Sequence, residues 1–185
     1  MRKFLARRGI RAFGAHYDYD VDYMLHMLDI SVDKAIRFSG LAKMTATRAS
    51  VPARVAAAAK LVGSIREDCG PCVQLGVKMA QESGLADDQI RAVLTGDRAE
   101  MSDDTACAWQ FATALVAHAP DLDSAREAVR SRWGDGGVLD LTLATQISRV
   151  FPMVKVGLGH GQACQRVQVS NRPVEVSPLP VAGTA

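Results

Sequence analysis

An alanine-rich stretch runs directly into a Cys-Gly-Pro-Cys motif, and this junction limits the folds that the chain can adopt. The stretch from Ala53 to about Arg66 contains four consecutive alanines and places its apolar side chains on one helical face, which continues to Cys69. Pro71 is suited to the first turn of a new helix, because no N–H group is needed from it there. The sequence therefore predicts a dithiol at the junction of two helices.

Helical periodicity recurs along most of the chain. We expect further helices over residues 17–42, 71–83, 87–94, 102–118, 121–133 and 138–158. The last of these is apolar on nearly all sides, which predicts a central buried helix, kinked or split at Pro152. Aromatic residues make up only 5% of the chain, which favours close-packed helices over a sheet, and only residues 166–169 hint at strand alternation. The predicted fold class is all-α.

Composition divides the chain into three parts. We expect a basic N-terminal arm over residues 1–16, without regular structure over residues 1–15. A single helical domain is expected over residues 17–169, and a flexible tail rich in proline over residues 170–185. The net charge of +2 predicts no nucleic-acid partner. No apolar run approaches the roughly 18 residues that span a bilayer, so no membrane partner and a cytoplasmic location are expected.

The two cysteines of the motif have the positions that dithiol redox chemistry requires. Cys69 lies near a helix N-cap, where free N–H groups and the helix dipole stabilise a thiolate, and Cys72 follows one turn later on the same side. In the cytoplasm, where thiols are kept reduced, such a pair indicates disulfide exchange or peroxide reduction. We expect no cofactor and no metal.

Two other interpretations of the motif stay open. A zinc site would need two further ligands, and the candidates are scattered singly along the chain: Cys107, His118, His160 and Cys164. Alternatively, the two cysteines pack as small apolar residues. The same four letters also occur in thioredoxin, but there the motif follows a buried strand, whereas residues 54–61 here are strongly helical.

Two segments, residues 65–75 and 138–143, resemble the carboxymuconolactone decarboxylase superfamily, and within it the branch of alkylhydroperoxidase D. The resemblance covers roughly residues 17–164. It implies an all-helical fold, a homo-oligomer of two, three or six subunits, and an enzyme that reduces peroxides through its Cys-x-x-Cys pair. We therefore expect a thiol oxidoreductase that uses Cys69 and Cys72, takes a peroxide or disulfide as substrate and is regenerated by a dithiol reductant protein.

The sequence departs from the family's pattern at two positions. The family usually has a histidine four residues after the second cysteine and a glutamate twelve residues before the first, where this chain has Gly76 and Ala57. Because these groups form the family's proton relay, the relay does not transfer to this chain. Their loss also argues against the parent decarboxylase activity. A helical oligomer that is non-catalytic, or a redox sensor of the same fold, is the alternative.

Glu67 is the nearest candidate for a replacement base, since a buried carboxylate two residues before Cys69 can accept a thiol proton. Three histidines could also reach the dithiol from other helices: His16, His26 and His118. The order of attack stays open. The resemblance implies that Cys72 attacks the peroxide, whereas the helix-terminus argument favours Cys69 as the more acidic thiol.

Overall fold

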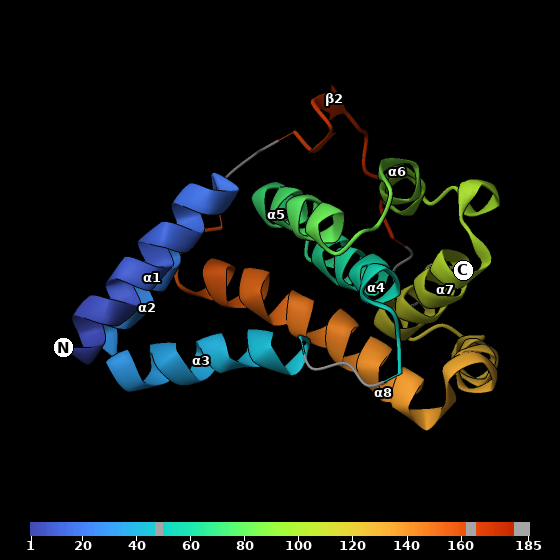
Figure 1. Ribbon diagram of the computed structural model, residues 1–185, viewed down its shortest axis with the longest axis horizontal. Coiled ribbons are helices and arrows are strands. Elements are labelled where there is room, and N and C mark those ends of the chain that lie inside the picture. Colours follow the sequence, from blue (N-terminus) through green and yellow to red (C-terminus); the bar gives the residue numbers. More distant parts are fainter. Residues whose placement is uncertain (47–49, 162–165, 180–185) are drawn as a thin grey trace.

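The computed structural model describes residues 1–46, 50–161 and 166–179 (Figure 1). Within these ranges the chain forms eight α-helices, one 3-10 turn and a two-stranded antiparallel ribbon. In order, they are α1 (Arg2–Tyr17), α2 (Asp22–Ile30), α3 (Val32–Met44), α4 (Ala53–Arg66), α5 (Gly70–Glu82), α6 (Asp87–Thr95), η1 (Arg98–Glu100), α7 (Asp103–Ala117), α8 (Leu122–Gly157), β1 (Gln168–Val169) and β2 (Arg172–Pro173). The prediction of an all-α protein is confirmed at this level. No helix in the described part of the chain is long and apolar enough to cross a bilayer.

Helix α4 is the centre of the molecule. Ten of its fourteen residues are buried, and it packs against α5, α7 and α8. Its alanines allow this packing, because side chains that end at Cβ let neighbouring helix axes approach closely. The predicted range from Ala53 to Arg66 is confirmed at both ends, with Pro52 directly before the first helical residue.

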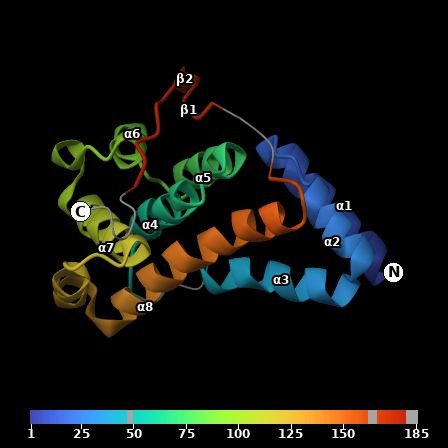
Figure 2. The same cartoon turned by 180° about the vertical axis from the view of Figure 1, so that it is seen from behind.

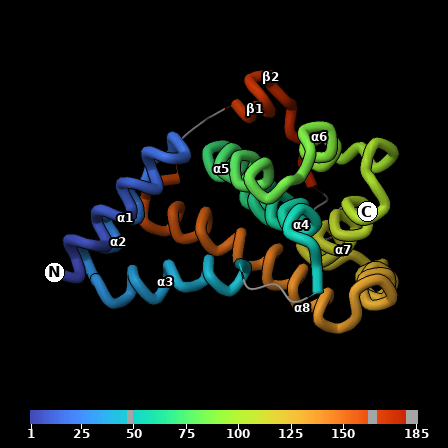
Figure 3. The backbone as a smooth tube through the Cα atoms, in the orientation of Figure 1, coloured from blue at the N-terminus to red at the C-terminus, as the bar shows by residue number. Residues whose placement is uncertain are grey.

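The remaining helices surround α4 and α5 on several sides. The tube in Figure 3 shows α1, α2 and α3 at one end of the molecule, α6 and α7 at the other, and α8 running along most of its length. From behind, α1 and α2 lie side by side (Figure 2), in agreement with their contacts. The dithiol junction between α4 and α5 therefore lies in the middle of the molecule.

The span α8 (Leu122–Gly157) consists of two helices that meet at a kink at Gly134, whose backbone angles (φ 68°, ψ −172°) are non-helical. The break predicted between the helices of residues 121–133 and 138–158 is therefore confirmed. Pro152 lies inside the helix without interrupting it. The prediction of a central buried helix is wrong, because Leu139, Met153 and Val156 are each more than half exposed and α4 occupies the centre instead.

The N-terminal prediction of an irregular arm over residues 1–15 is also wrong. Residues 2–17 form α1, which packs on α2 and α3 and ends where Asp18 adopts a left-handed conformation. The single helical stretch expected over residues 17–42 is divided between α2 and α3. The break lies at Ser31, whose hydroxyl accepts a hydrogen bond from the Lys34 N–H at 3.4 Å and caps α3.

The C-terminal segment, defined here as residues 166–179, lies against the helices rather than free in solvent. The N–H of Ser177 donates to the carbonyl of Leu94 at 2.9 Å, and that of Val174 donates to the carbonyl of Val167 at 2.9 Å. Three of its apolar side chains pack on the core: Val174, Val176 and Leu179. Part of the predicted tail therefore contacts the helical core, whereas the flexibility predicted for residues 170–185 stays a prediction. The hint of alternation in residues 166–169 is realised in β1.

Candidate functional site

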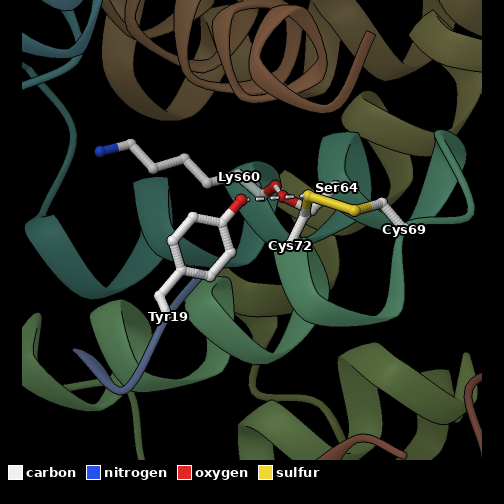
Figure 4. The surroundings of a disulfide bond; sticks show 5 residues. All are labelled: Tyr19, Lys60, Ser64, Cys69 and Cys72. Atoms are coloured by element: carbon white, nitrogen blue, oxygen red, sulfur yellow. Dashed lines mark hydrogen bonds between the residues drawn. A yellow bond between two sulfur atoms is a disulfide. The ribbon is translucent and has the colours of Figure 1, made fainter. Parts of the chain in front are cut away.

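The dithiol forms a buried disulfide at the start of α5. Cys69 is the N-cap residue, Pro71 follows in the first turn, and the Cys69 and Cys72 sulfurs are bonded, with Cα atoms 5.2 Å apart. Their residues are 9% and 6% exposed. A turn through Glu67 and Asp68, the latter with φ of 48°, redirects the chain from α4 into α5. The predicted helix–helix junction is thus confirmed, and Figure 4 shows its surroundings.

The two sulfurs belong to two different cavities. Cys72 lines a cavity of about 730 Å³, partly open to solvent, whose walls come from α1, α2, α3, α4, α5 and α8. Cys69 instead lines a smaller pocket of about 310 Å³, on the side of the C-terminal segment, where Val174, Val176 and Ser177 form part of the wall. The disulfide therefore lies between an inner cavity and a pocket at the C-terminal segment.

The inner cavity is mostly apolar and lies within the 300–1,000 Å³ usual for small-molecule sites. Large side chains from several helices line it, among them Phe13, Met24, Leu28, Ile36 and Phe151. Gly76 and Ala57, which stand where the resembled family has its relay, also line it. A Cβ at Gly76 would already meet Leu61 Cδ2 at 3.1 Å, so this wall has no space for a larger side chain without displacement.

Tyr19 supplies the polar contact to Cys72. Its hydroxyl lies 3.6 Å from Cys72 Sγ, at the inner cavity, and Figure 4 shows the ring pointing that hydroxyl toward the sulfur. Burial raises the pKa of Tyr19 to about 12, an effect that a hydrogen bond from Tyr23 partly offsets. The phenol therefore keeps its proton at neutral pH and can donate a hydrogen bond to sulfur.

Lys155 is the second polar group near Tyr19. It projects from the last turns of α8, is 1% exposed, and its Nζ has no hydrogen-bond partner among the described residues. The ammonium lies over the Tyr19 ring, 5.3 Å from the ring centroid. Neither Tyr19 nor Lys155 was expected from the sequence. A single lysine within the apolar run of residues 150–158 is the signal that could have pointed to Lys155.

Glu67 lies at the C-terminal end of α4 with its carboxylate engaged by another helix. Arg149 Nε of α8 donates to Glu67 Oε1 at 2.6 Å, and both side chains are about a fifth exposed. This ion pair connects the turn before Cys69 to α8. The role of Glu67 as a base stays a prediction.

The histidines named as possible partners of the dithiol make other contacts. His16 pairs with Glu82 at 2.8 Å, His26 Nδ1 lies 3.1 Å from His160 Nε2, and His118 closes α7 in a left-handed conformation. Cys107 is a half-buried free thiol, and burial raises its pKa. Cys164 lies outside the described residues. Among the residues described, no group of three or more His, Cys, Asp or Glu side chains is placed to hold a metal ion.

No family model, curated protein or solved structure matches the chain. The likeness of residues 65–75 and 138–143 to the carboxymuconolactone decarboxylase superfamily therefore enters below only as part of a proposal. What the site itself provides is a buried disulfide, a phenol at one sulfur, a buried ammonium beside that phenol, and a cavity on each side.

Proposed function

We propose that the protein is a thiol oxidoreductase of the alkylhydroperoxidase D-like type that reduces peroxides through Cys69 and Cys72. The observation that carries the proposal is the placement of the pair. It spans a helix N-terminus between an apolar cavity large enough for a small molecule and a separate pocket at the C-terminal segment. A purely structural disulfide has no need of a cavity at each sulfur.

The cycle begins with the reduced pair. The Cys72 thiolate attacks the terminal oxygen of a hydroperoxide, the O–O bond breaks, Cys72 becomes a sulfenic acid, and the alkoxide that leaves takes a proton from water. The Cys69 thiol then attacks the sulfenic sulfur, forming the disulfide and releasing water. A dithiol reductant exchanges with the disulfide, returning two thiols and leaving as a disulfide itself. Over one cycle the peroxide and the dithiol yield an alcohol, water and the oxidised reductant.

The two cavities favour this order of attack. Cys72 lies at the inner cavity and contacts the Tyr19 hydroxyl, which can stabilise a thiolate there by hydrogen bonding. Cys69 lies at the N-cap of α5, where free N–H groups and the helix dipole stabilise a thiolate, as suits a thiol that must leave during exchange. We therefore assign peroxide attack to Cys72, and resolution and exchange with the reductant to Cys69.

The lining of the inner cavity indicates which class of peroxide the protein would bind more tightly. Because its walls are mostly apolar, an organic hydroperoxide with an apolar body gains more from burial than hydrogen peroxide does. Each methylene group transferred from water adds about 0.8 kcal/mol. We expect kcat/KM to rise with the apolar size of the hydroperoxide until the cavity is filled.

Peroxide turnover with an excess of a small dithiol tests the proposal. The wild type is compared with Cys69→Ser, Cys72→Ser and the double variant, with Cys107→Ser as the matched control. We expect turnover of an organic hydroperoxide by the wild type and by Cys107→Ser, and its loss in all three variants of the motif. Turnover by the wild type no faster than by the double variant would contradict the proposal and favour a redox sensor or a structural disulfide.

A further inference from the structure

Lys155 is an unusual charge for the interior of a helical protein. It is 1% exposed, and no carboxylate or carbonyl among the described residues accepts a hydrogen bond from its Nζ. Burying an ammonium without such a partner is costly, because its hydration is lost and nothing replaces it. The Lys155 ammonium makes a cation–π contact with the ring of Tyr19, whose centroid is 5.3 Å away. Such a contact compensates only part of the cost of burying the ammonium.

The missing counter-charge has a natural source in the proposed redox cycle, on which this inference rests. In the disulfide state Cys72 carries no charge. Once the disulfide is reduced, ionisation of Cys72 places a negative charge on the sulfur that lies 3.6 Å from the Tyr19 hydroxyl. The ring of the same tyrosine faces Lys155. In surroundings this buried, opposite charges are weakly screened and act strongly on each other.

We propose that Tyr19 and Lys155 together stabilise the Cys72 thiolate: Tyr19 donates a hydrogen bond to the sulfur, and Lys155 acts through the Tyr19 ring as a positioning residue. Tyr23 supports this arrangement by sharing a hydrogen bond with Tyr19. This pair gives the chain a way to activate Cys72 that does not use the positions of Ala57 and Gly76.

Other ionisable groups near Cys72 are directed elsewhere. Lys60 of α4 donates to the carbonyl of Thr45 at 3.4 Å, and Figure 4 shows its ammonium extending away from the sulfurs. Glu67 at the end of α4 is held by Arg149 of α8. Cys69 on α5 is the partner thiol. Glu82, which also lines the inner cavity, is bound by His16 and Tyr17. The groups expected to set the pKa of Cys72 are therefore Tyr19, Tyr23, Lys155 and Cys69, together with Asp20, whose charge acts on both tyrosines.

The pKa of the Cys72 thiol tests the proposal directly. It is measured from the pH dependence of iodoacetamide alkylation in Cys69→Ser protein, which leaves Cys72 without its disulfide partner. We expect Tyr19→Phe and Lys155→Met each to raise this pKa by about one, which is roughly a tenfold loss of thiolate at neutral pH. Because Lys155 acts through Tyr19, the double variant should raise it by less than the sum of the two.

Matched controls separate this role from a merely structural one. Tyr17→Phe removes a hydroxyl that contacts Glu82, and Lys34→Met removes an exposed ammonium, so neither should move the Cys72 pKa. Unchanged Cys72 pKa values in Tyr19→Phe and Lys155→Met would overturn the proposal, even if the wild type reduces peroxides. Raised values would support it, even if no peroxide is turned over. Should Lys155→Met fail to fold, Tyr19→Phe alone decides the outcome.

Discussion

At the scale of residues, two polar side chains from distant parts of the chain meet beside Cys72. The Tyr19 hydroxyl lies 3.6 Å from Cys72 Sγ, and the Lys155 ammonium lies over the Tyr19 ring. The spacing of the motif was enough to identify Cys69 and Cys72, because a Cys-x-x-Cys pair at a helix start is local in sequence. Tyr19 and Lys155 could not be identified in this way. They lie 53 residues before and 83 residues after Cys72, and only the packing of α8 and the segment before α2 brings them to it.

Glu67 provides a prediction at this scale. Glu67→Gln removes the charge that Arg149 binds and should lower the free energy of unfolding by about 1 kcal/mol, measured by urea denaturation. Arg149→Met should cost a similar amount, and the double variant should cost less than the sum because the two residues form one pair. The rate of Cys72 alkylation at neutral pH distinguishes two roles of Glu67. If Glu67 acts as a base, Glu67→Gln will slow this alkylation. If Glu67 only forms the ion pair with Arg149, the rate will not change.

At the scale of elements, the contact between α4 and α8 positions the dithiol junction. Gly63 of α4 lies against the backbone of Thr145 and the hydroxyl of Ser148 in α8, so close that a Cβ would overlap both. Asp140 of α8 also accepts backbone hydrogen bonds from Ser50 and Val51 at 3.1 and 3.3 Å, just before α4 begins. These contacts fix α4 along α8.

Gly63→Ala should therefore destabilise the protein. Overlap with the backbone of α8 is relieved only by separating the helices, at a cost of about 1–3 kcal/mol in the free energy of unfolding. Gly40→Ala in α3 is the matched control. No atom lies within 4 Å of its added Cβ, so the gain in helix propensity should stabilise the protein by about 0.5–1 kcal/mol. Urea denaturation of both variants measures the difference, and equal shifts would show that α4 and α8 are not in close contact at Gly63.

The C-terminal segment is the second element that lies beside the dithiol. Val176 lines the pocket of Cys69 and packs on the core, so Val176→Asp should detach the segment locally. We expect reduction of the disulfide by dithiothreitol to become several-fold faster, with Glu175→Ala, an exposed neighbour, as the control. An unchanged rate in Val176→Asp would show that the segment does not limit access to Cys69.

Element boundaries were predictable where local signals were strong. The alanine run defined α4 at both ends, and Pro71 with Gly84 bracketed α5 to within a residue. Contacts between distant segments could not be predicted in this way. The basic residues of α1 concealed a helix that packs on α2 and α3, and the prolines near the C-terminus concealed the hydrogen bond from Ser177 to Leu94 of α6. Pro152 is accommodated inside α8.

At the scale of the whole molecule, the arrangement of helices separates the two faces of one disulfide. Helices α1, α2 and α3 line the cavity of Cys72, and the C-terminal segment lines the pocket of Cys69. Separation of this kind fits the proposed two-substrate cycle, in which the peroxide and the reductant approach different sulfurs. The all-α class followed from composition and periodicity, whereas neither cavity could be foreseen because each is built from segments far apart in sequence. The homo-oligomer stays a prediction.

A single oxidation of the reduced protein tests whether Cys69 and Cys72 together reduce a peroxide. Anaerobic protein is treated with one equivalent of an organic hydroperoxide, the remaining thiols are alkylated, and the cysteine-containing peptides are identified by mass spectrometry. We expect a Cys69–Cys72 disulfide in proportion to the peroxide consumed. Cys107 should remain a thiol, because burial raises its pKa and leaves little thiolate to react with peroxide, and it is then recovered by alkylation after the protein is unfolded. Recovery of Cys69 and Cys72 as alkylated thiols, with the peroxide unconsumed, would contradict the account.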